Sequence, residues 1–363
     1  MESTEILKEA VLWEPAEEQK IRCRLCGFRC RIGEDKLGHC NVRKNIGGKL
    51  YSLNYCKVCA ANPDPIEKKP LYHFLPGSRS FSIAAVGCNF RCEFCQNWQI
   101  SQAAVPRDSS PGKRGQDARE TQGRDALATY GEALSPEQIV EAAVKTGCKS
   151  VAYTYTEPTI FMELCNDCAR PAKERGLANV FVSNGYMTRE AIDFAAGWLD
   201  GINVDLKAFS EDYYKRLCGA RLEPVLDSIA YIARQTDIWI EITTLLLPGQ
   251  NDSKEELKKL AGWLVAEAGP DVPWHISRFY PQYKYTDSEP TPLESMQRAE
   301  EIGKAAGLHY VYLGNVPGTD GENTYCCNCR KRLIERRGYR IIANHIKDSK
   351  CPNCGTEIAG FGL

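Results

Sequence analysis

The 363-residue chain has little of what a membrane, secreted or nucleic-acid-binding protein needs. No apolar run approaches the ~20 residues of a transmembrane helix. The segment 1–15, MESTEILKEAVLWEP, is acidic and lacks the apolar core of an export signal. The formal charge is −1, and positive and negative residues are mixed along the chain. The sequence therefore has no strongly basic region of the kind that binds nucleic acids through their phosphates. We expect a soluble cytoplasmic protein; a local RNA contact stays open.

Cysteine, by contrast, is abundant, with 18 residues in the chain. In a secreted protein these residues would suggest disulfides, but here there is no export signal and most of them cluster at short spacings. Metal ligation therefore explains the clustered cysteines better than bridging does. Four others fall within helix or strand patterns and are predicted to be small buried hydrophobes: Cys148, Cys165, Cys168 and Cys218.

The sequence pattern divides the chain into three predicted regions. Residues 1–79 are Cys-rich and have few long periodic segments, residues 80–316 alternate apolar runs with amphipathic helices, and residues 317–363 are again Cys-rich. Inside the middle region, residues 104–134 are rich in Gly, Pro, Ser and charge. This composition predicts a flexible insertion, with a lid or docking loop as the alternative.

In the middle region, predicted strands alternate regularly with single helices. This pattern implies that the strands pair in parallel. Ser135 and Pro136 are predicted to begin a helix, and Thr291 with Glu294 is predicted to form a capping box. Seven buried strands are predicted, at 81–86, 150–155, 179–183, 201–206, 238–245, 274–279 and 309–313. We therefore expect an α/β fold, a partial (β/α)6-type TIM barrel with Cys-rich N-terminal and C-terminal metal-binding appendages, because a full barrel needs eight units.

One loop carries the pattern that points to catalysis. After the first predicted strand comes GCNFRCEFCQNW, with thiols at Cys88, Cys92 and Cys95. Three thiolates can hold three irons of a cubane and leave the fourth iron open to a ligand, whereas zinc in a structural site takes four protein ligands. The spacing Cys-x3-Cys-x2-Cys, with the aromatic Phe94 before the last cysteine, resembles the signature of the radical SAM superfamily.

The resemblance implies an oxidoreductase that binds S-adenosylmethionine (AdoMet) at the open iron of a 4Fe–4S cluster, with the three cysteines as catalytic residues and Phe94 in the cofactor-binding wall. A low-potential donor such as ferredoxin or flavodoxin would supply one electron. AdoMet would then be cleaved reductively to methionine and a 5′-deoxyadenosyl radical, which abstracts hydrogen from an unidentified substrate. The protein orients and shields this chemistry.

Polar residues recur at the ends of the other predicted strands, where barrel enzymes place their active sites. YTEP resembles the Gly-Gly-Glu motif that receives the AdoMet ammonium, with Glu157 as the acid, and SNG and DLK resemble AdoMet-contacting segments of glycyl-radical activating enzymes. The predicted cofactor-binding residues are Glu157, Ser183, Asn184, Asp205, Lys207, Glu241 and His275. Simpler roles stay open: a helix cap for Glu157, a mutual ion pair for Asp205 and Lys207, and a core position for His275.

The flanking cysteines predict further metal sites. Cys326-x2-Cys329 and Cys351-x2-Cys354, 21 residues apart, have zinc-ribbon spacing, although a single iron would bind with the same geometry. Cys327 is not expected to bind the metal. Near the N-terminus, a structural zinc or an auxiliary iron–sulfur cluster is predicted on Cys23, Cys26, Cys30 and Cys40, and Cys56 and Cys59 are alternative ligands.

About residues 20–360, except 104–134, resemble one subgroup, the AmmeMemoRadiSam-system radical SAM enzymes, which are similar to pyruvate formate-lyase activating enzymes. The motifs that carry this resemblance include DPIEKKPLYHFLPGSRS, LLLPGQNDS, WHISRFYP and YLGNVPG. It implies companion proteins of the Memo and AMMECR1 types. Two alternatives remain: an activase that makes a glycyl radical in a partner protein, and a zinc-dependent module that binds RNA or protein.

Overall fold

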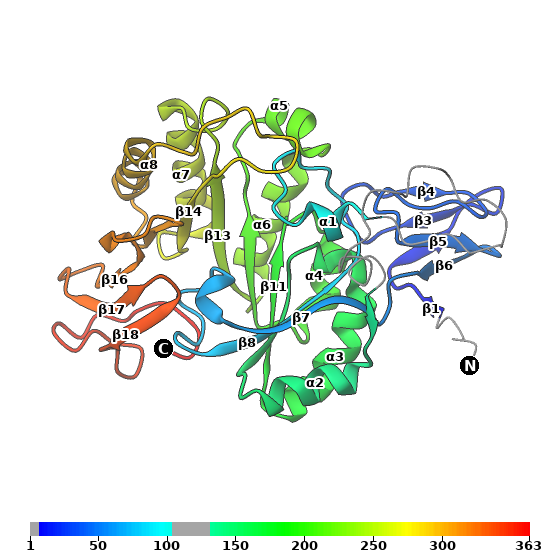
Figure 1. Cartoon of the computed structure of the whole chain (residues 1–363), viewed down its shortest axis with the longest axis horizontal. Helices are drawn as coiled ribbons and strands as arrows, with labels where there is room; N and C mark the ends of the chain where they lie inside the picture. The colour runs from blue at the N-terminus through cyan, green and yellow to red at the C-terminus, as the bar shows by residue number, and fades with distance from the viewer. Residues whose placement is uncertain (1–6, 104–130) are drawn as a thin grey trace.

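The computed structural model describes residues 7–103 and 131–363 (Figure 1). Most of the predicted insertion 104–134 lies outside these residues. Within them, no helix combines the length and apolar character required to cross a bilayer.

The centre of the described chain is a nine-stranded sheet in the order β15-β14-β13-β12-β11-β10-β8-β7-β9. At one side of the sheet, β7 (Lys57–Pro65) and the edge strand β9 (Glu132–Ala133) are antiparallel to their neighbours. The others are parallel: β8 (Arg79–Ala85), β10 (Ser150–Tyr153), β11 (Ala178–Ser183), β12 (Gly201–Asp205), β13 (Trp239–Leu246), β14 (Trp274–Arg278) and β15 (Val311–Gly314). The predicted partial barrel is therefore confirmed.

Helices connect the parallel strands and cover the outside of the sheet (Figure 1). They are α1 (Trp98–Ser101), α2 (Pro136–Lys145), α3 (Met162–Glu174), α4 (Arg189–Ala196), α5 (Glu211–Tyr213), α6 (Glu223–Gln235), α7 (Lys254–Ala268) and α8 (Leu293–Ala306). Shorter turns are η1 (Ile66–Lys68), η2 (Pro158–Phe161), η3 (Tyr214–Cys218) and η4 (Asp320–Glu322). The helix α2 begins as predicted, because Ser135 and Gln138 form a capping box ahead of Pro136.

The predicted capping box at Thr291 is wrong. The helix α8 has Pro292 as its N-terminal cap, and the Thr291 hydroxyl donates to Leu246 O and accepts from Phe279 N instead. The Thr291 hydroxyl therefore makes long-range hydrogen bonds at the ends of β13 and β14 instead of capping the helix as the local pattern predicted.

Small antiparallel sheets flank the barrel at opposite sides (Figure 1). The N-terminal strands are β1 (Lys8–Glu9), β2 (Trp13–Pro15), β3 (Ile21–Cys23), β4 (Arg31–Ile32), β5 (Arg43–Ile46) and β6 (Lys49–Ser52). The C-terminal strands are β16 (Thr324–Tyr325), β17 (Arg332–Arg337) and β18 (Arg340–Asn344). The strand β7, although inside the predicted region 1–79, belongs to the main sheet.

The connection between β7 and β8 fills the inside of the partial barrel. Its buried Phe74 stacks on Phe361 at 4.5 Å between ring centroids, and Leu75 N donates to Phe361 O. Next to it, Asn203 Nδ2 of β12 donates to Pro70 O at 2.8 Å. The β7–β8 connection thus closes one end of the barrel interior, with the exposed ring of Phe361 covering Phe74, and the other end is free for a cavity.

Candidate functional site

A cavity of about 1270 Å³ lies at the carboxyl ends of the parallel strands. Segment 154–156 after β10, Ser183 at the end of β11 and Asp205 at the end of β12 line it. Barrel enzymes place their active sites at this end, because the loops there can vary without disturbing the barrel. The lining contains the predicted Cys88, Cys92, Phe94, Cys95, Ser183, Asn184, Asp205, Lys207 and His275.

The three predicted cluster ligands lie together on the cysteine loop, residues 88–95, and all line the cavity. Phe90 N donates to Cys88 Sγ at 3.3 Å, and Cys95 Sγ lies 3.2 Å from Ser101 Oγ. Burial raises the pKa of Cys88 well above its ordinary value and also raises the pKa of Cys95. These thiols therefore need a metal to displace their protons, and backbone and hydroxyl donors are in place to stabilise the resulting charge.

Cys92 differs from the other two thiols because it has charge-stabilising neighbours. A hydrogen bond from the Cys218 thiol lowers the pKa of Cys92, and the ammonium of Lys207 adds to this effect. Cys218 is not among the described residues that line the cavity. Cys218 therefore contacts Cys92 on the side away from the cavity, and the cavity side of the cysteine loop stays open. Three cysteines in this arrangement fit a cluster that can bind a further ligand.

Glu157 does not face the cavity. Its carboxylate caps η2 by accepting from Thr159 N at 3.0 Å, and it also accepts from Ser183 Oγ and Asn184 N, both at 2.8 Å. The residue is fully buried, and this burial raises its pKa. The capping role left open by the sequence is therefore present, and Glu157 ties the ends of β10 and β11 together, while its contact with the AdoMet ammonium stays a prediction.

Asn184 connects the end of β11 to the cysteine loop. Its Nδ2 donates to Asn89 Oδ1 at 2.7 Å and lies 3.9 Å from Cys88 Sγ, while its Oδ1 accepts from Tyr186 N. The side chain is 6% exposed, and it lines the cavity together with Ser183. These residues can therefore orient both the cluster ligands and a molecule bound beside them.

Asp205 and Lys207 line the cavity as an ion pair with an N–O distance of 2.8 Å. Burial opposes the charge on Lys207, but Asp205 and the thiol of Cys92 outweigh it and hold the pKa of Lys207 well above its ordinary value. The ammonium also lies 5.9 Å from the centre of the Phe94 ring. The pair thus keeps one fixed positive charge next to the cysteine loop.

Glu241 forms part of the support of the barrel interior. Its carboxylate accepts from Tyr72 N at 2.9 Å, His73 N at 2.8 Å and Trp239 Nε1 at 3.0 Å, and it lies 2.6 Å from His275 Nε2. Among the described residues, Glu241 does not line the cavity, whereas His275 does. Glu241 therefore holds His275 and the β7–β8 connection, and its direct contact with a cofactor stays a prediction.

The C-terminal quartet, Cys326, Cys329, Cys351 and Cys354, is a compact thiol group. Its sulfurs all lie within 4.8 Å of one another, and two pairs are separated by 3.6 and 3.7 Å. A tetrahedral zinc with Zn–S bonds of about 2.3 Å places sulfurs about 3.8 Å apart. The quartet therefore fits a single metal ion, and Cys327 lies outside it.

The N-terminal quartet, Cys23, Cys26, Cys30 and Cys40, also gathers in space. The other three thiols are close enough to Cys26 to interact with it electrostatically. Within the described chain, however, no three of these sulfurs lie inside a 4.8 Å sphere as the C-terminal ones do. The alternative ligands have other neighbours: the Cys59 thiol donates to Ala84 O of the main sheet, and Cys56 lies beside Tyr55 and Asp167.

Sequence reasoning missed several residues that line the cavity. Thr154, Tyr155 and Thr156 face it in place of Glu157, and Tyr155 has a left-handed φ of +65°. The sequence contained a signal for Tyr155, because this residue occupies a position where the Gly-Gly-Glu motif has glycine. Arg336 of the C-terminal hairpin also lines the cavity, and no local pattern pointed to it.

Comparisons with known proteins agree with this geometry. The profile of the Radical SAM superfamily matches residues 82–261. An uncharacterized protein of Methanocaldococcus jannaschii is 42% identical over 97% of this chain and 99% of its own length. The chain belongs to the radical SAM superfamily. A second M. jannaschii protein, provisionally named a glycyl-radical enzyme activating enzyme, is 24% identical over 66% of this chain and 80% of its own.

Among solved structures, the radical SAM chain resembles Streptococcus suis SuiB bound to S-adenosylmethionine. The sequence identity is 14%, the match covers 69% of this chain and 53% of that chain, and the TM-score is 0.45. Membership of the superfamily makes this protein a radical SAM enzyme, with a 4Fe–4S cluster and AdoMet as its cofactors. It cleaves AdoMet reductively and removes hydrogen from a substrate.

Proposed function

We propose that the cysteine loop holds the catalytic cluster and that AdoMet lies in the cavity against Asn184, Asp205 and Lys207. The observation that carries this proposal is that all three thiols of the loop line one cavity whose facing side is open. When reduced by one electron, the bound cofactors supply the 5′-deoxyadenosyl radical that abstracts hydrogen from the substrate. The protein holds, orients and shields the reacting groups.

Each residue of this site has a distinct task in the proposal. Lys207 offers a positive charge to the AdoMet carboxylate, and Asp205 keeps that ammonium in place at 2.8 Å. Asn184 fixes the cysteine loop through Asn89. Phe94 covers one side of the cavity with an apolar ring that excludes water from the radical.

The substrate side of the cavity is formed by the C-terminal hairpin and the barrel interior. Arg336, Thr243 and Glu67 line it, and Arg336 Nε lies 3.9 Å from Glu67 Oε1. This lining offers charged and hydroxyl groups, which supports a polar substrate. In this proposal the hairpin helps to select what reaches the radical.

A second candidate is that the substrate is a segment of a partner protein, as in an activase. Two observations favour it: the relative provisionally named a glycyl-radical enzyme activating enzyme, and a cavity of about 1270 Å³, which exceeds the ~300–1,000 Å³ of small-molecule pockets. We further propose that the chain belongs to the AmmeMemoRadiSam subgroup, which would make Memo-like and AMMECR1-like proteins its companions and the first proteins to test.

We also propose that the C-terminal quartet binds structural zinc and that residues 1–79, 80–316 and 317–363 form the three functional parts of the chain. Free thiols and an iron–sulfur cluster persist in a reducing compartment, which supports a cytoplasmic location. Ferredoxin or flavodoxin is the proposed electron donor.

The test is anaerobic turnover with AdoMet and dithionite in the presence of deuterated candidate substrates, including the companion proteins. We expect 5′-deoxyadenosine to form and to gain deuterium from the true substrate. Cys92→Ala should abolish formation, whereas the matched Cys327→Ala should not, because Cys327 lies outside both thiol groups. Undiminished formation by the Cys92 variant would refute the assignment of the cysteine loop.

A further inference from the structure

The N-terminal quartet lies in a short hairpin and the loop that follows it. Cys23 ends β3, and Cys23 N donates to Cys30 O at 2.9 Å across the turn to β4. Cys40 comes from the next loop, ahead of β5. Three of the four residues are at most 8% exposed. Four cysteines from a region with so few helices and strands therefore converge at one buried place.

Backbone amides in this region are already oriented toward the sulfurs. Phe28 N donates to Cys26, Val42 N to Cys40, and His39 N to Cys30 Sγ at 3.4 Å. The first two bonds come from the second residue after the cysteine, as the bond from Phe90 to Cys88 does in the cysteine loop. Such N–H···S bonds stabilise thiolate ligands.

The sulfurs of the C-terminal quartet are more closely spaced than those of the other two thiol groups. The C-terminal quartet has sulfur pairs at 3.6 and 3.7 Å, as tetrahedral zinc requires. In the described residues, neither the N-terminal quartet nor the cysteine loop gathers three sulfurs within 4.8 Å. A cubane holds its thiolates on separate irons, so it needs the wider arrangement. In this respect the N-terminal quartet matches the catalytic loop rather than the ribbon.

A buried cation accompanies the quartet. Arg43 is 1% exposed, its Nη1 lies 3.9 Å from Cys23 Sγ, and Cys40 is also an electrostatic neighbour. Its other terminal nitrogen is paired with Glu163, and its Nε is buried without a partner. A guanidinium this close to Cys23 Sγ can donate to a thiolate ligand, while Glu163 offsets its full charge.

The quartet lies against the catalytic cysteine loop. A Cβ at Gly87, the residue before Cys88, would lie 3.4 Å from Cys40 O. The side chain of Arg91 donates to His39 O at 2.6 Å and to Cys88 O at 2.7 Å, and so joins the two groups directly.

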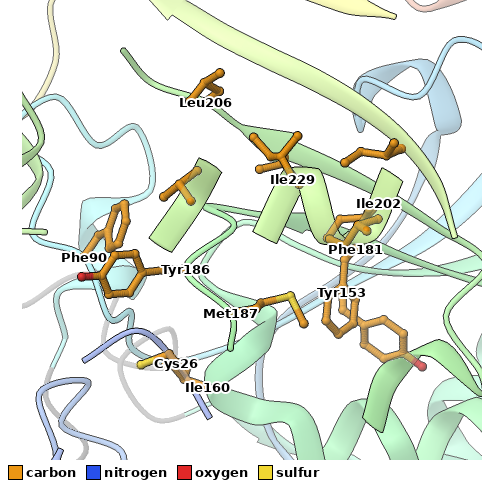
Figure 2. Packing of buried hydrophobic residues seen from close by; sticks show 14 of the residues in the cluster. Cys26, Phe90, Tyr153, Ile160, Phe181, Tyr186, Met187, Ile202, Leu206 and Ile229 are labelled. Atoms are coloured by element: carbon orange, nitrogen blue, oxygen red, sulfur yellow. The ribbon is translucent and has the colours of Figure 1, made fainter. Parts of the chain in front are cut away.

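A continuous row of rings joins the same two groups. His39 stacks on Phe28 at 3.9 Å, Phe28 packs on Tyr186 at 4.9 Å, and Tyr186 packs on Phe90 of the cysteine loop at 5.2 Å. Figure 2 shows the last of these pairs, with Cys26 on the neighbouring N-terminal segment. A row of ring contacts therefore connects the quartet to the cysteine loop.

We propose that the N-terminal quartet binds a second iron–sulfur cluster that passes single electrons to the cluster on the cysteine loop. This inference rests on the proposed function for its electron acceptor. In each transfer, one electron leaves the reduced N-terminal cluster and is taken up by the catalytic cluster. A reduced one-electron carrier protein of the ferredoxin class then restores the first cluster. No bond is made or broken in this step.

The first test counts iron and sulfide in two variants purified anaerobically. The triple substitution C88A/C92A/C95A should keep about four irons and four sulfides, as one cubane requires, and a paramagnetic signal that AdoMet does not change. The double substitution C26A/C30A should keep only the AdoMet-responsive signal. Cys59→Ala, a thiol of the same region bonded to the main sheet, is the matched control. A triple variant that contains zinc and no iron would overturn the inference.

The second test addresses electron transfer. In the fully reduced wild-type protein, magnetic interaction should broaden the signals of both clusters, and C26A/C30A should slow reduction of the catalytic cluster by reduced ferredoxin at least tenfold. Unbroadened signals would overturn the relay even if C26A/C30A fails to fold. Should the wild type instead lack any AdoMet-responsive signal while the triple variant keeps its four irons, the proposed function fails and the second cluster stands.

Discussion

The Ser183 hydroxyl donates to the Glu157 carboxylate at 2.8 Å, deep beneath the cavity. This bond joins the end of β11 to the cap of the turn after β10, and Asn184 N adds a second bond to the same carboxylate. The lining residues of two adjacent strands are thus positioned by one buried acid that does not itself line the cavity among the described residues.

Replacing Glu157 by Gln should destabilise this junction. A glutamine amide brings a donor where the carboxylate accepts several bonds, so we expect the free energy of unfolding to fall by about 1–3 kcal/mol. Urea unfolding measures the change, and Glu137→Gln on the surface of α2 is the control. Equal stability of the two variants would show that the bonds around Glu157 contribute little.

Gly87→Ala tests the contact between the N-terminal quartet and the cysteine loop. A Cβ at Gly87 would come within 2.7 Å of Val42 Cγ1, whereas at Gly147, which also has a positive φ, it would meet nothing within 4 Å. Both substitutions carry backbone strain, at φ of +103° and +70°, so Gly147→Ala removes much of that contribution from the comparison. We expect Gly87→Ala to cost about 1–3 kcal/mol more, measured by thermal unfolding. No difference would mean that the contact adapts freely.

Lys207→Met should weaken AdoMet binding. The substitution keeps much of the side-chain volume but removes the charge beside Asp205 and Cys92, leaving the Asp205 carboxylate without its partner. We expect affinity for AdoMet to fall about tenfold, equivalent to about 1.4 kcal/mol, with the AdoMet-induced change in the cluster signal requiring proportionally more ligand. Lys215→Gln, on the surface next to α5, should change neither measurement. An unaltered titration for Lys207→Met would exclude the proposed carboxylate contact.

Cys351→Ala should release one metal ion per chain and loosen the C-terminal hairpin, because structural metal binding is coupled to folding. Elemental analysis gives the metal count, and hydrogen exchange of β17 and β18 reports the loosening. Cys327→Ala is the matched control, since it lies in the same knuckle but outside the quartet. A metal count that survives the Cys351 substitution would contradict the ligand assignment.

The stability of the protein should fall in mild acid because of His73. Burial lowers the pKa of His73 from 6.5 to about 4, so the folded chain resists the proton that the unfolded chain accepts. Its contribution is fully present above pH 6.5 and is lost as the pH falls towards 4, by up to about 3 kcal/mol.

The measurement is the unfolding midpoint across that range for wild type, for His73→Gln and for His309→Gln, whose ring is exposed. His73→Gln should flatten the dependence, and His309→Gln should leave it in place. A wild-type midpoint that stays level between pH 6.5 and 4 would argue against a neutral buried ring.

The parallel strands could be predicted from the sequence because each is a short, almost wholly buried run bounded by helix signals. The position of the cysteine loop beside the cavity could be predicted from the same pattern, since the loop comes directly after β8. The N-terminal strands, only two to four residues long ahead of β7, carry too little periodicity to be recognised. Their positions depend on packing against distant parts of the chain.

Residue roles were harder to predict than residue positions. Glu157 lies in the right segment, but the neighbouring Ser183 and Asn184 use its oxygens, and no one-dimensional pattern reveals that competition. Cys218 was predicted as a buried hydrophobe and is buried, yet it also donates a hydrogen bond to Cys92. Such contacts, between residues 26 to 126 positions apart, arise only in the folded chain.

The stacking of Phe74 on Phe361 has a consequence for synthesis in the cell. Every parallel strand and the cysteine loop precede Phe361 in the chain, so they are all synthesised before the ring that covers Phe74. This cover therefore forms later during synthesis than the contacts between the parallel strands can.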